Sequence, residues 1–263
     1  MIPKTIHYCW FGHNEKPPLA RKCIDSWRKK CPGYHIIEWN ESNFDINCCD
    51  YVKEAYEAKK WAFVADYARL WIIYHYGGIY LDTDVEIIKP YDTFLKNQAF
   101  FGFERVGLDE EKKCIATGLG FGATANNEVV RRMLSAYDGV HFKIKEGQFD
   151  LTTCPIRNTK ALEDLLPKKY AYNKVIDIGD AVLYPPEFFC PLDASGKEMN
   201  LTENTHSIHW YGASWLSDEE QIIHKYRVLN NKLQRIFGPK LGSYIVRGMY
   251  LFKPYERSIL KKY

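Results

Sequence analysis

The sequence has no long hydrophobic run and no recognisable leader segment. No stretch reaches the ~18 consecutive apolar residues of a membrane-spanning helix. Residues 1–10 lack the positively charged region followed by an apolar run that marks a secretory signal peptide. These absences predict a cytoplasmic protein.

The eight cysteines lack the spacing of a disulfide mini-protein. None forms a C-x-x-C pair, and a chain of 263 residues is long enough to bury a core without cross-links. We therefore expect reduced, mostly buried thiols. Hydrophobic residues make up 46% of the chain, which excludes wholesale disorder. The length suits one large α/β domain with an appendage.

Charge is divided unequally along the chain. Residues 221–263 hold ten Lys and Arg and one Glu, a net charge of +9, whereas residues 1–220 hold 26 basic and 32 acidic residues, a net charge of −6. The basic segment also carries apolar and aromatic residues at helical spacing, interrupted at Gly238-Pro239. We therefore predict a domain over residues 1–220 and a basic, aromatic, helical C-terminal segment over residues 221–263.

This C-terminal segment has two interpretations. Basic and aromatic-apolar residues together are typical of a helix that lies on an anionic membrane surface. The alternative is a helical hairpin packed on the body, with its basic face in solvent. Nucleic acid is not an expected partner, because no nucleic-acid-binding motif is present.

Hydrophobic periodicity predicts alternating strands and helices. Strands are expected at residues 2–11, 34–39, 79–81, 85–88, 99–104 and 118–122. Helices are expected at residues 19–30, 51–60, 61–76 and 127–137. Gly77-Gly78 should end the helix of residues 61–76, and Asn126 or Asn127 should cap the helix that begins there. This alternation indicates an α/β sheet.

Two carboxylates follow the short apolar strand at residues 79–81. Asp82-Thr83-Asp84 lies at the carboxyl end of that strand, where ligands bind in open α/β sheets. Alternate side chains of an extended chain share one face, so Asp82 and Asp84 should point the same way. They would repel each other without a cation, and Mg²⁺ or Mn²⁺ would leave positions open for substrate phosphates. Taken alone, the tripeptide is more typical of a solvated acidic turn.

A charged pair precedes this tripeptide in an otherwise apolar helix. Asp66 and Arg69 are three residues apart, so they share one helical face. A buried charge pair is costly unless it serves a site. The pair is therefore a candidate part of the same site, and the alternative is an internal salt bridge.

The run A-D-Y-A-R-L-W-I-I-Y-H-Y-G-G-I-Y-L-D-T-D, residues 65–84, resembles the glycosyltransferases with a D-x-D sugar-binding region, family 32. It is also similar to the catalytic domains of the large clostridial glucosylating toxins. The opening I-P-K-T-I-H-Y-C-W-F-G resembles the first strand of these enzymes. The resemblance is strong over residues 2–90, fair to Trp215 and absent from the C-terminal segment. It implies a GT-A fold, with a mixed central sheet and flanking helices, and sugar transfer from a nucleotide diphosphate with retention of configuration.

The resemblance implies roles for the matching residues. Asp66 would bind sugar hydroxyls or the ribose, and Arg69 would contact the donor sugar. Tyr80 would pack beside the nucleotide. Asp82 would contact the ribose and the metal, and Asp84 would ligate the metal directly.

The second half of the chain has one more matching segment. His209 in N-T-H-S-I-H-W-Y-G-A-S-W is similar to the late His-x-x-Gly loop of metal-dependent GT-A enzymes, where a neutral imidazole completes the metal shell. His206 is the alternative ligand. Ser214 and Trp215 would then meet the diphosphate through the hydroxyl and the indole N–H. The alternative is that both histidines lie on the surface before a core tryptophan and have no role in a site.

Three other segments are less specific. Trp10 would stack on the base, or it is an ordinary core residue at the end of a strand. Residues 118–122, G-L-G-F-G, lack a complete phosphate-loop pattern and are better interpreted as a close-packed strand that lines the donor or acceptor pocket. Residues 152–155, T-T-C-P, lie where relatives often carry Gly-Pro near the acceptor, so the acceptor contacts are left open.

We therefore expect a metal-dependent retaining glycosyltransferase that uses Mn²⁺ or Mg²⁺. Its donor would be a nucleotide-sugar, and we expect a UDP-hexose. Its acceptor would be a glycan or lipid-linked oligosaccharide in bacterial surface or capsular polysaccharide synthesis, at the inner face of the plasma membrane. The alternatives are a toxin-like enzyme that glycosylates a host protein and a non-catalytic sugar-binding protein on the same fold. No residue is assigned as general base.

Overall fold

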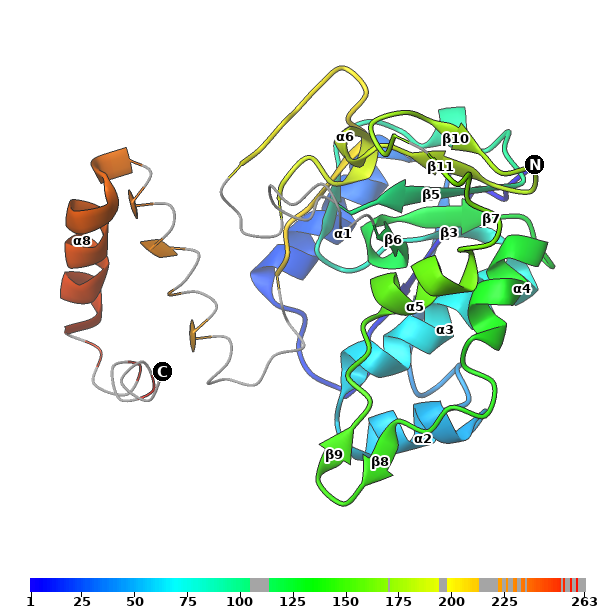
Figure 1. Cartoon of the computed structure of the whole chain (residues 1–263), viewed down its shortest axis with the longest axis horizontal. Helices are drawn as coiled ribbons and strands as arrows, with labels where there is room; N and C mark the ends of the chain where they lie inside the picture. The colour runs from blue at the N-terminus through cyan, green and yellow to red at the C-terminus, as the bar shows by residue number, and fades with distance from the viewer. Residues whose placement is uncertain are drawn as a thin grey trace.

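Figure 1 shows a computed structural model of the chain. The structure describes residues 1–104, 114–169, 171–193 and 198–212. In the C-terminal segment it describes residues 222–223, 226, 229–230, 233–234, 236–251, 253, 256 and 259.

A mixed sheet of eight strands forms the centre of the fold (Figure 1). The strands on its main path, in spatial order, are β10 (Ile176–Asp177), β11 (Val182–Tyr184), β5 (Ala99–Phe103), β7 (Phe121–Ala123), β3 (Gly78–Tyr80), β1 (Thr5–Cys9) and β2 (His35–Trp39), and β6 (Ile115–Ala116) pairs with β5. β1 runs parallel to β2 and β3, whereas β7 runs antiparallel to both β3 and β5. Two smaller sheets pair β4 (Val85–Ile87) with β12 (Ser207–His209), and β8 (Lys143–Lys145) with β9 (Gln148–Phe149). The predicted α/β class with a mixed central sheet and flanking helices is confirmed.

Helices cover both faces of the sheet. The helices with described bounds are α1 (Pro18–Lys30), α2 (Asp50–Glu57), α3 (Trp61–Tyr76), α4 (Glu128–Ser135), α5 (Cys154–Ala161), α6 (Pro186–Phe189) and α8 (Pro239–Leu251). The described residues also form the 3₁₀ turns η1 (Asp92–Phe94) and η2 (Thr117–Leu119). α2, α3 and α4 enclose one hydrophobic core against the sheet, and α1 and α6 enclose a second core. Side chains of β5 alternate between them: Phe101 and Phe103 enter the first core, and Phe100 enters the second.

The glycine pair after α3 ends that helix where the sequence predicts. Gly77 has φ +66° and Gly78 has φ +108°, a region that side-chain-bearing residues rarely adopt. A Cβ on Gly78 would also lie 2.8 Å from the carbonyl oxygen of Thr5. The chain therefore turns from α3 directly into β3 without a long loop.

The strand predicted at residues 118–122 is wrong in its first half. Residues 117–119 form η2, and the strand β7 begins only at Phe121. Gly120 has φ +111°, which breaks the extended backbone between the two. The predicted helix after residue 126 is present as α4, and Asn127 caps it by accepting the backbone N–H groups of Val129 and Val130.

The C-terminal segment contains the helix α8, preceded by Gly238 at φ +80°. Within the described ranges, no helix combines the length and the apolar character needed to cross a bilayer. The boundary predicted at residue 220 stays a prediction.

Candidate active site

The β4–β12 ribbon brings Asp84 and His209 together from distant parts of the chain. Asp84 precedes β4, His209 ends β12, and Val85 is the register partner of His209. The Nε2 atom of His209 lies 3.2 Å from Oδ1 of Asp84. The backbone N–H of Gly212 donates to Oδ2 of the same carboxylate at 2.8 Å. Both oxygens of Asp84 are thus oriented by residues of the second half of the chain.

Asp82 joins this pair to form a cluster of metal-ligand type. Asp82, Asp84 and His209 each offer one ligand atom, and these atoms lie within 4.8 Å of one another. In the described part of the chain this is the only such group of three or more His, Cys, Asp or Glu residues. The alternative ligand His206 lies elsewhere, with Nδ1 2.8 Å from the carbonyl oxygen of Pro90.

Arg69 connects the cluster to α3. Its Nη2 atom lies 2.9 Å from Oδ1 of Asp66 and 3.1 Å from Oδ1 of Asp82. The hydroxyl of Tyr80 donates to the same oxygen of Asp82 at 3.0 Å. The Arg69 side chain is only 4% exposed, so one guanidinium nitrogen joins two carboxylates away from bulk water. The salt bridge predicted as an alternative exists, and its Arg69 also pairs with Asp82 of the cluster.

Burial and neighbouring charges separate the acidities of the three carboxylates. Burial raises the pKa of Asp66 to about 6 against the opposing charge of Arg69. Burial likewise raises the pKa of Asp82. Burial alone would also raise the pKa of Asp84, but the charge and hydrogen bond of His209 lower it overall. Asp84 is therefore the carboxylate best kept ionised beside a cation.

His209 has one free ring atom. Burial alone would lower its pKa, but Asp84, Asp82 and Glu104 together raise it. Its Nδ1 atom is buried and has no hydrogen-bond partner among the residues that the structure describes. Buried polar atoms of this kind are normally paired, so Nδ1 of His209 is a candidate for a further contact.

Gly118 allows η2 to approach the cluster closely. A Cβ on this residue would lie 2.4 Å from Oδ2 of Asp82 and 3.3 Å from Nη1 of Arg69. The glycine-rich segment therefore contributes a backbone that lies against the cluster, as a 3₁₀ turn and not as the predicted strand. That it lines a donor or acceptor pocket stays a prediction.

The sequence interpretation did not include Glu104 and Tyr211. The Tyr211 hydroxyl donates to Oε1 of Glu104 at 3.3 Å, and its ring centroid lies 4.3 Å from that of His209. Burial raises the pKa of Glu104. Since β7 is antiparallel to both β3 and β5, those two strands run in the same direction and end at the same edge of the sheet. An acidic residue directly after the predicted strand at 99–104 was the available signal.

Trp10 does not join the cluster through any contact in the described part of the chain. Its Nε1–H donates to the carbonyl oxygen of Asn14 at 2.6 Å, and Nζ of Lys16 lies 5.6 Å from the ring centroid. The side chain is half-buried at the end of β1. Ser214 and Trp215 lie outside the described residues.

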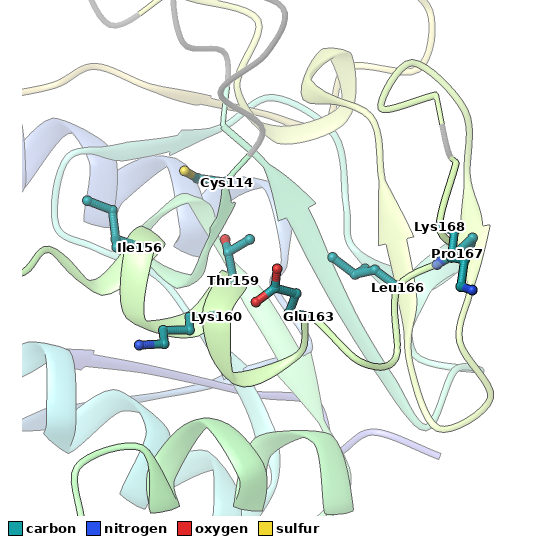
Figure 2. Close-up of a pocket in the computed structure, with 8 residues that line it drawn as sticks. All are labelled: Cys114, Ile156, Thr159, Lys160, Glu163, Leu166, Pro167 and Lys168. Atoms are coloured by element: carbon teal, nitrogen blue, oxygen red, sulfur yellow. The ribbon is translucent and has the colours of Figure 1, made fainter.

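A separate hollow of about 570 Å³ lies along α5 (Figure 2). Its lining residues are Cys114, Ile156, Thr159, Lys160, Glu163, Leu166, Pro167 and Lys168. None of them belongs to the acidic cluster, so the hollow and the cluster are distinct features.

Residues 17–101 match the family described as "Glycosyltransferase sugar-binding region containing DXD motif". This range includes Asp66, Arg69, Tyr80, Asp82 and Asp84. The match confirms the resemblance to the D-x-D glycosyltransferases.

Three curated proteins are similar to part of the chain. "Inositol phosphoceramide mannosyltransferase 1" of Schizosaccharomyces pombe is 30% identical over 110 residues, which are 38% of this chain and 33% of that protein. "Subversion of eukaryotic traffic protein A" of Legionella pneumophila is 30% identical over 129 residues, 39% of this chain and 20% of that protein. "Inositol phosphoceramide mannosyltransferase 3" of S. pombe is 35% identical over 107 residues, 38% of this chain and 29% of that protein. The matches span about a third or less of these relatives.

Two solved structures are similar at low identity. "PaToxG Glycosyltransferase" has 20% identity and a TM-score of 0.44, over 63% of this chain and 70% of that chain. A glycosyltransferase involved in the glycosylation of the major capsid of PBCV-1 has 16% identity and a TM-score of 0.46, over 86% of this chain and 98% of that chain.

Proposed function

We propose that this chain is a metal-dependent glycosyltransferase that transfers a hexose from a nucleotide-sugar, with retention of configuration, to a glycan or lipid-linked acceptor. The convergence of Asp82, Asp84 and His209 beside the Asp66–Arg69 pair carries the proposal. The family match over residues 17–101 supports it.

Asp82, Asp84 and His209 would hold the divalent ion. Two carboxylates and an imidazole suit Mn²⁺ better than Mg²⁺, because Mg²⁺ prefers an all-oxygen shell. Bound there, the ion would neutralise the charge that develops on the leaving diphosphate. Arg69, held by Asp66 and Asp82, would orient the hexose, and Tyr80 would fix the Asp82 carboxylate through its hydroxyl.

The proposed donor is a UDP-hexose, and the relatives' names add a second candidate. Two of them are mannosyltransferases that act on inositol phosphoceramide, so a mannose donor belongs in the first assays. The acceptor in these names is a lipid, which agrees with a lipid-linked oligosaccharide acceptor in bacterial surface polysaccharide synthesis.

The decisive experiment is hydrolysis of a panel of UDP- and GDP-sugars by the purified protein, with and without Mn²⁺. Turnover of one donor that depends on the metal supports the proposal and identifies the sugar. Failure to hydrolyse or bind any donor, the latter measured by calorimetry, refutes it and favours a non-catalytic sugar-binding protein. Binding without turnover calls for lipid-linked glycans as acceptors in a second round.

We further propose that α8 places the enzyme on the cytoplasmic face of an anionic membrane. Leu241, Tyr244 and Met249 of this helix are exposed by 54%, 73% and 52%. Lys240 and Arg247 are seven residues apart and lie on the same side of the helix as Tyr244, and α8 contains no acidic residue. Exposed apolar and aromatic residues beside basic ones are suited to the headgroup region of anionic lipids.

Sedimentation with phosphatidylglycerol vesicles tests this membrane proposal. The full chain should bind, whereas Tyr244→Asp and a chain without residues 221–263 should stay in the supernatant. Vesicles of phosphatidylcholine alone are the control for charge. Unchanged binding after the deletion would exclude the segment as the membrane contact.

The Legionella relative supports a second candidate function. Its name describes subversion of eukaryotic traffic, so a toxin-like enzyme that glycosylates a host protein is the alternative. Transfer of labelled sugar to proteins of a eukaryotic extract, with no transfer to bacterial lipid-linked glycans, would favour this alternative.

A further inference from the structure

The first residue of α5 brings a thiol to the Asp66–Arg69 pair. Sγ of Cys154 accepts a hydrogen bond from Nη1 of Arg69 at 3.5 Å. Cys154 is 6% exposed, so this contact lies inside the protein. None of the roles proposed above involves this side chain.

Two buried polar residues orient the thiol. Nδ2 of Asn158 donates to Oγ1 of Thr117 at 3.1 Å, and the Thr117 hydroxyl donates to Sγ of Cys154 at 3.8 Å. Thr117 and Asn158 are fully buried. Burial raises the pKa of Cys154, so the thiol keeps its proton beside Arg69. The donors of Asn158 and Thr117 therefore both point toward Sγ, and such chains strengthen each member.

The same thiol completes the contacts of Arg69. Nε donates to the carbonyl oxygen of Ala65 at 3.1 Å, and Nη2 pairs with Asp66 and Asp82. Nη1 lies against Cys154. Each nitrogen of the guanidinium therefore has a partner, and α5 supplies one of them.

Burying this polar line is costly to stability. Oδ1 of Asn158 is buried and has no hydrogen-bond partner within the described ranges. An unpaired buried oxygen destabilises a fold, and an apolar side chain of similar shape would avoid that penalty. The amide of Asn158 holds the Thr117 hydroxyl, which in turn donates to the thiol.

We propose that Cys154 is a positioning residue that orients the Asp66–Arg69 pair toward the donor sugar. Thr117 and Asn158 in turn orient the thiol. This inference rests on the proposed function for the part that concerns the sugar. The positioning of Arg69 itself concerns the free protein.

Four full-length variants test the inference. Cys154→Ala removes the thiol, Cys154→Ser keeps a donor and acceptor, and Thr117→Val removes the hydroxyl at nearly constant volume. Ile156→Ala is the matched control on α5, because this side chain is 55% exposed and lines the hollow of Figure 2. Thermal unfolding of each variant shows that the fold is retained.

The first readout is the NMR signals of the Arg69 guanidinium in the free protein. We expect separate Nη signals in the wild type, in Ile156→Ala and in Cys154→Ser, and averaged signals in Cys154→Ala. Thr117→Val should show partial averaging. Unchanged Arg69 signals in Cys154→Ala would overturn the inference, whether or not any donor binds.

The second readout is the donor dissociation constant, measured by calorimetry with Mn²⁺. Cys154→Ala should weaken binding about tenfold, the size expected for one lost hydrogen bond to a charged group. Cys154→Ser should recover most of the affinity, and a serine variant as weak as the alanine variant would overturn the hydrogen-bonding role. A wild type that binds no nucleotide-sugar refutes the proposed function, whereas the Arg69 signals still decide the positioning role.

Discussion

Gly118→Ala should disable the site while leaving the fold in place. The backbone of Gly118 has no left-handed φ, so alanine can adopt its conformation. The added methyl carbon would lie 2.4 Å from Oδ2 of Asp82. This distance is 1.0 Å shorter than the 3.4 Å at which ordinary van der Waals contact begins. Asp82 cannot yield freely, because Tyr80 and Arg69 hold its other oxygen at 3.0 and 3.1 Å. The carboxylate must therefore move by about 1 Å, and a displacement of that size in a reacting site costs roughly 100-fold in rate.

The assay compares kcat/KM for donor hydrolysis and Mn²⁺ affinity in Gly118→Ala and in Gly33→Ala. Gly33 is the matched control, because its Cβ would have no atom within 4 Å. We expect kcat/KM to fall about 100-fold in Gly118→Ala, with an overpacking penalty of ~1–3 kcal/mol in unfolding free energy. Gly33→Ala should behave as the wild type. Wild-type kcat/KM and metal affinity in Gly118→Ala would show that Asp82 does not depend on this close approach.

Three further predictions follow from charge and burial. Asp84→Ala should abolish transfer and retain the circular dichroism spectrum, and near-normal transfer would remove the metal role. Asp66→Asn should weaken donor binding yet equal or exceed the wild-type Tm at pH 8. Burial raises the pKa of Asp66 in the folded protein to about 6 from 3.8. At a pH above 6, ionisation of Asp66 therefore lowers the free energy of unfolding by up to about 3 kcal/mol. A Tm well below that of the wild type at pH 8 would contradict this prediction. His7 should make the fold acid-sensitive, because burial lowers its pKa to about 4 from 6.5. The free energy of unfolding is therefore unaffected by His7 above pH 6.5, and protonation of the unfolded chain lowers it by about 2.5 kcal/mol near pH 4.5. Urea unfolding at the two pH values tests it, and His7→Asn should lack this component.

Local patterns predicted the parts of the site that lie close together in the chain. Asp66 and Arg69 are one helical turn apart, and the glycine pair ends α3, so their relation to Asp82 depends on one short connection. His209 was predicted from a resemblance, and the β4–β12 register explains its place beside Asp84.

Contacts between distant segments could not be predicted from periodicity. Cys154 meets Arg69 across 85 positions, and Tyr211 meets Glu104 across 107. No repeat or regular spacing in the sequence links the two residues of either pair. The turn at Gly120 was also missed, because a glycine in an apolar run is compatible with both a strand and a break.

The β4–β12 ribbon also determines when the site can form during synthesis. Gly212 donates to Asp84 across 128 positions, so both oxygens of that carboxylate lack their partners until the late segment has left the ribosome. Domains generally fold as units as the chain emerges, and closing so long a loop is slow compared with forming α3 or β1. A nascent chain that ends before residue 209 therefore carries the D-T-D tripeptide without His209, its proposed partner in holding the metal ion. If the proposed function is right, sugar transfer should begin only after residue 212 has been added.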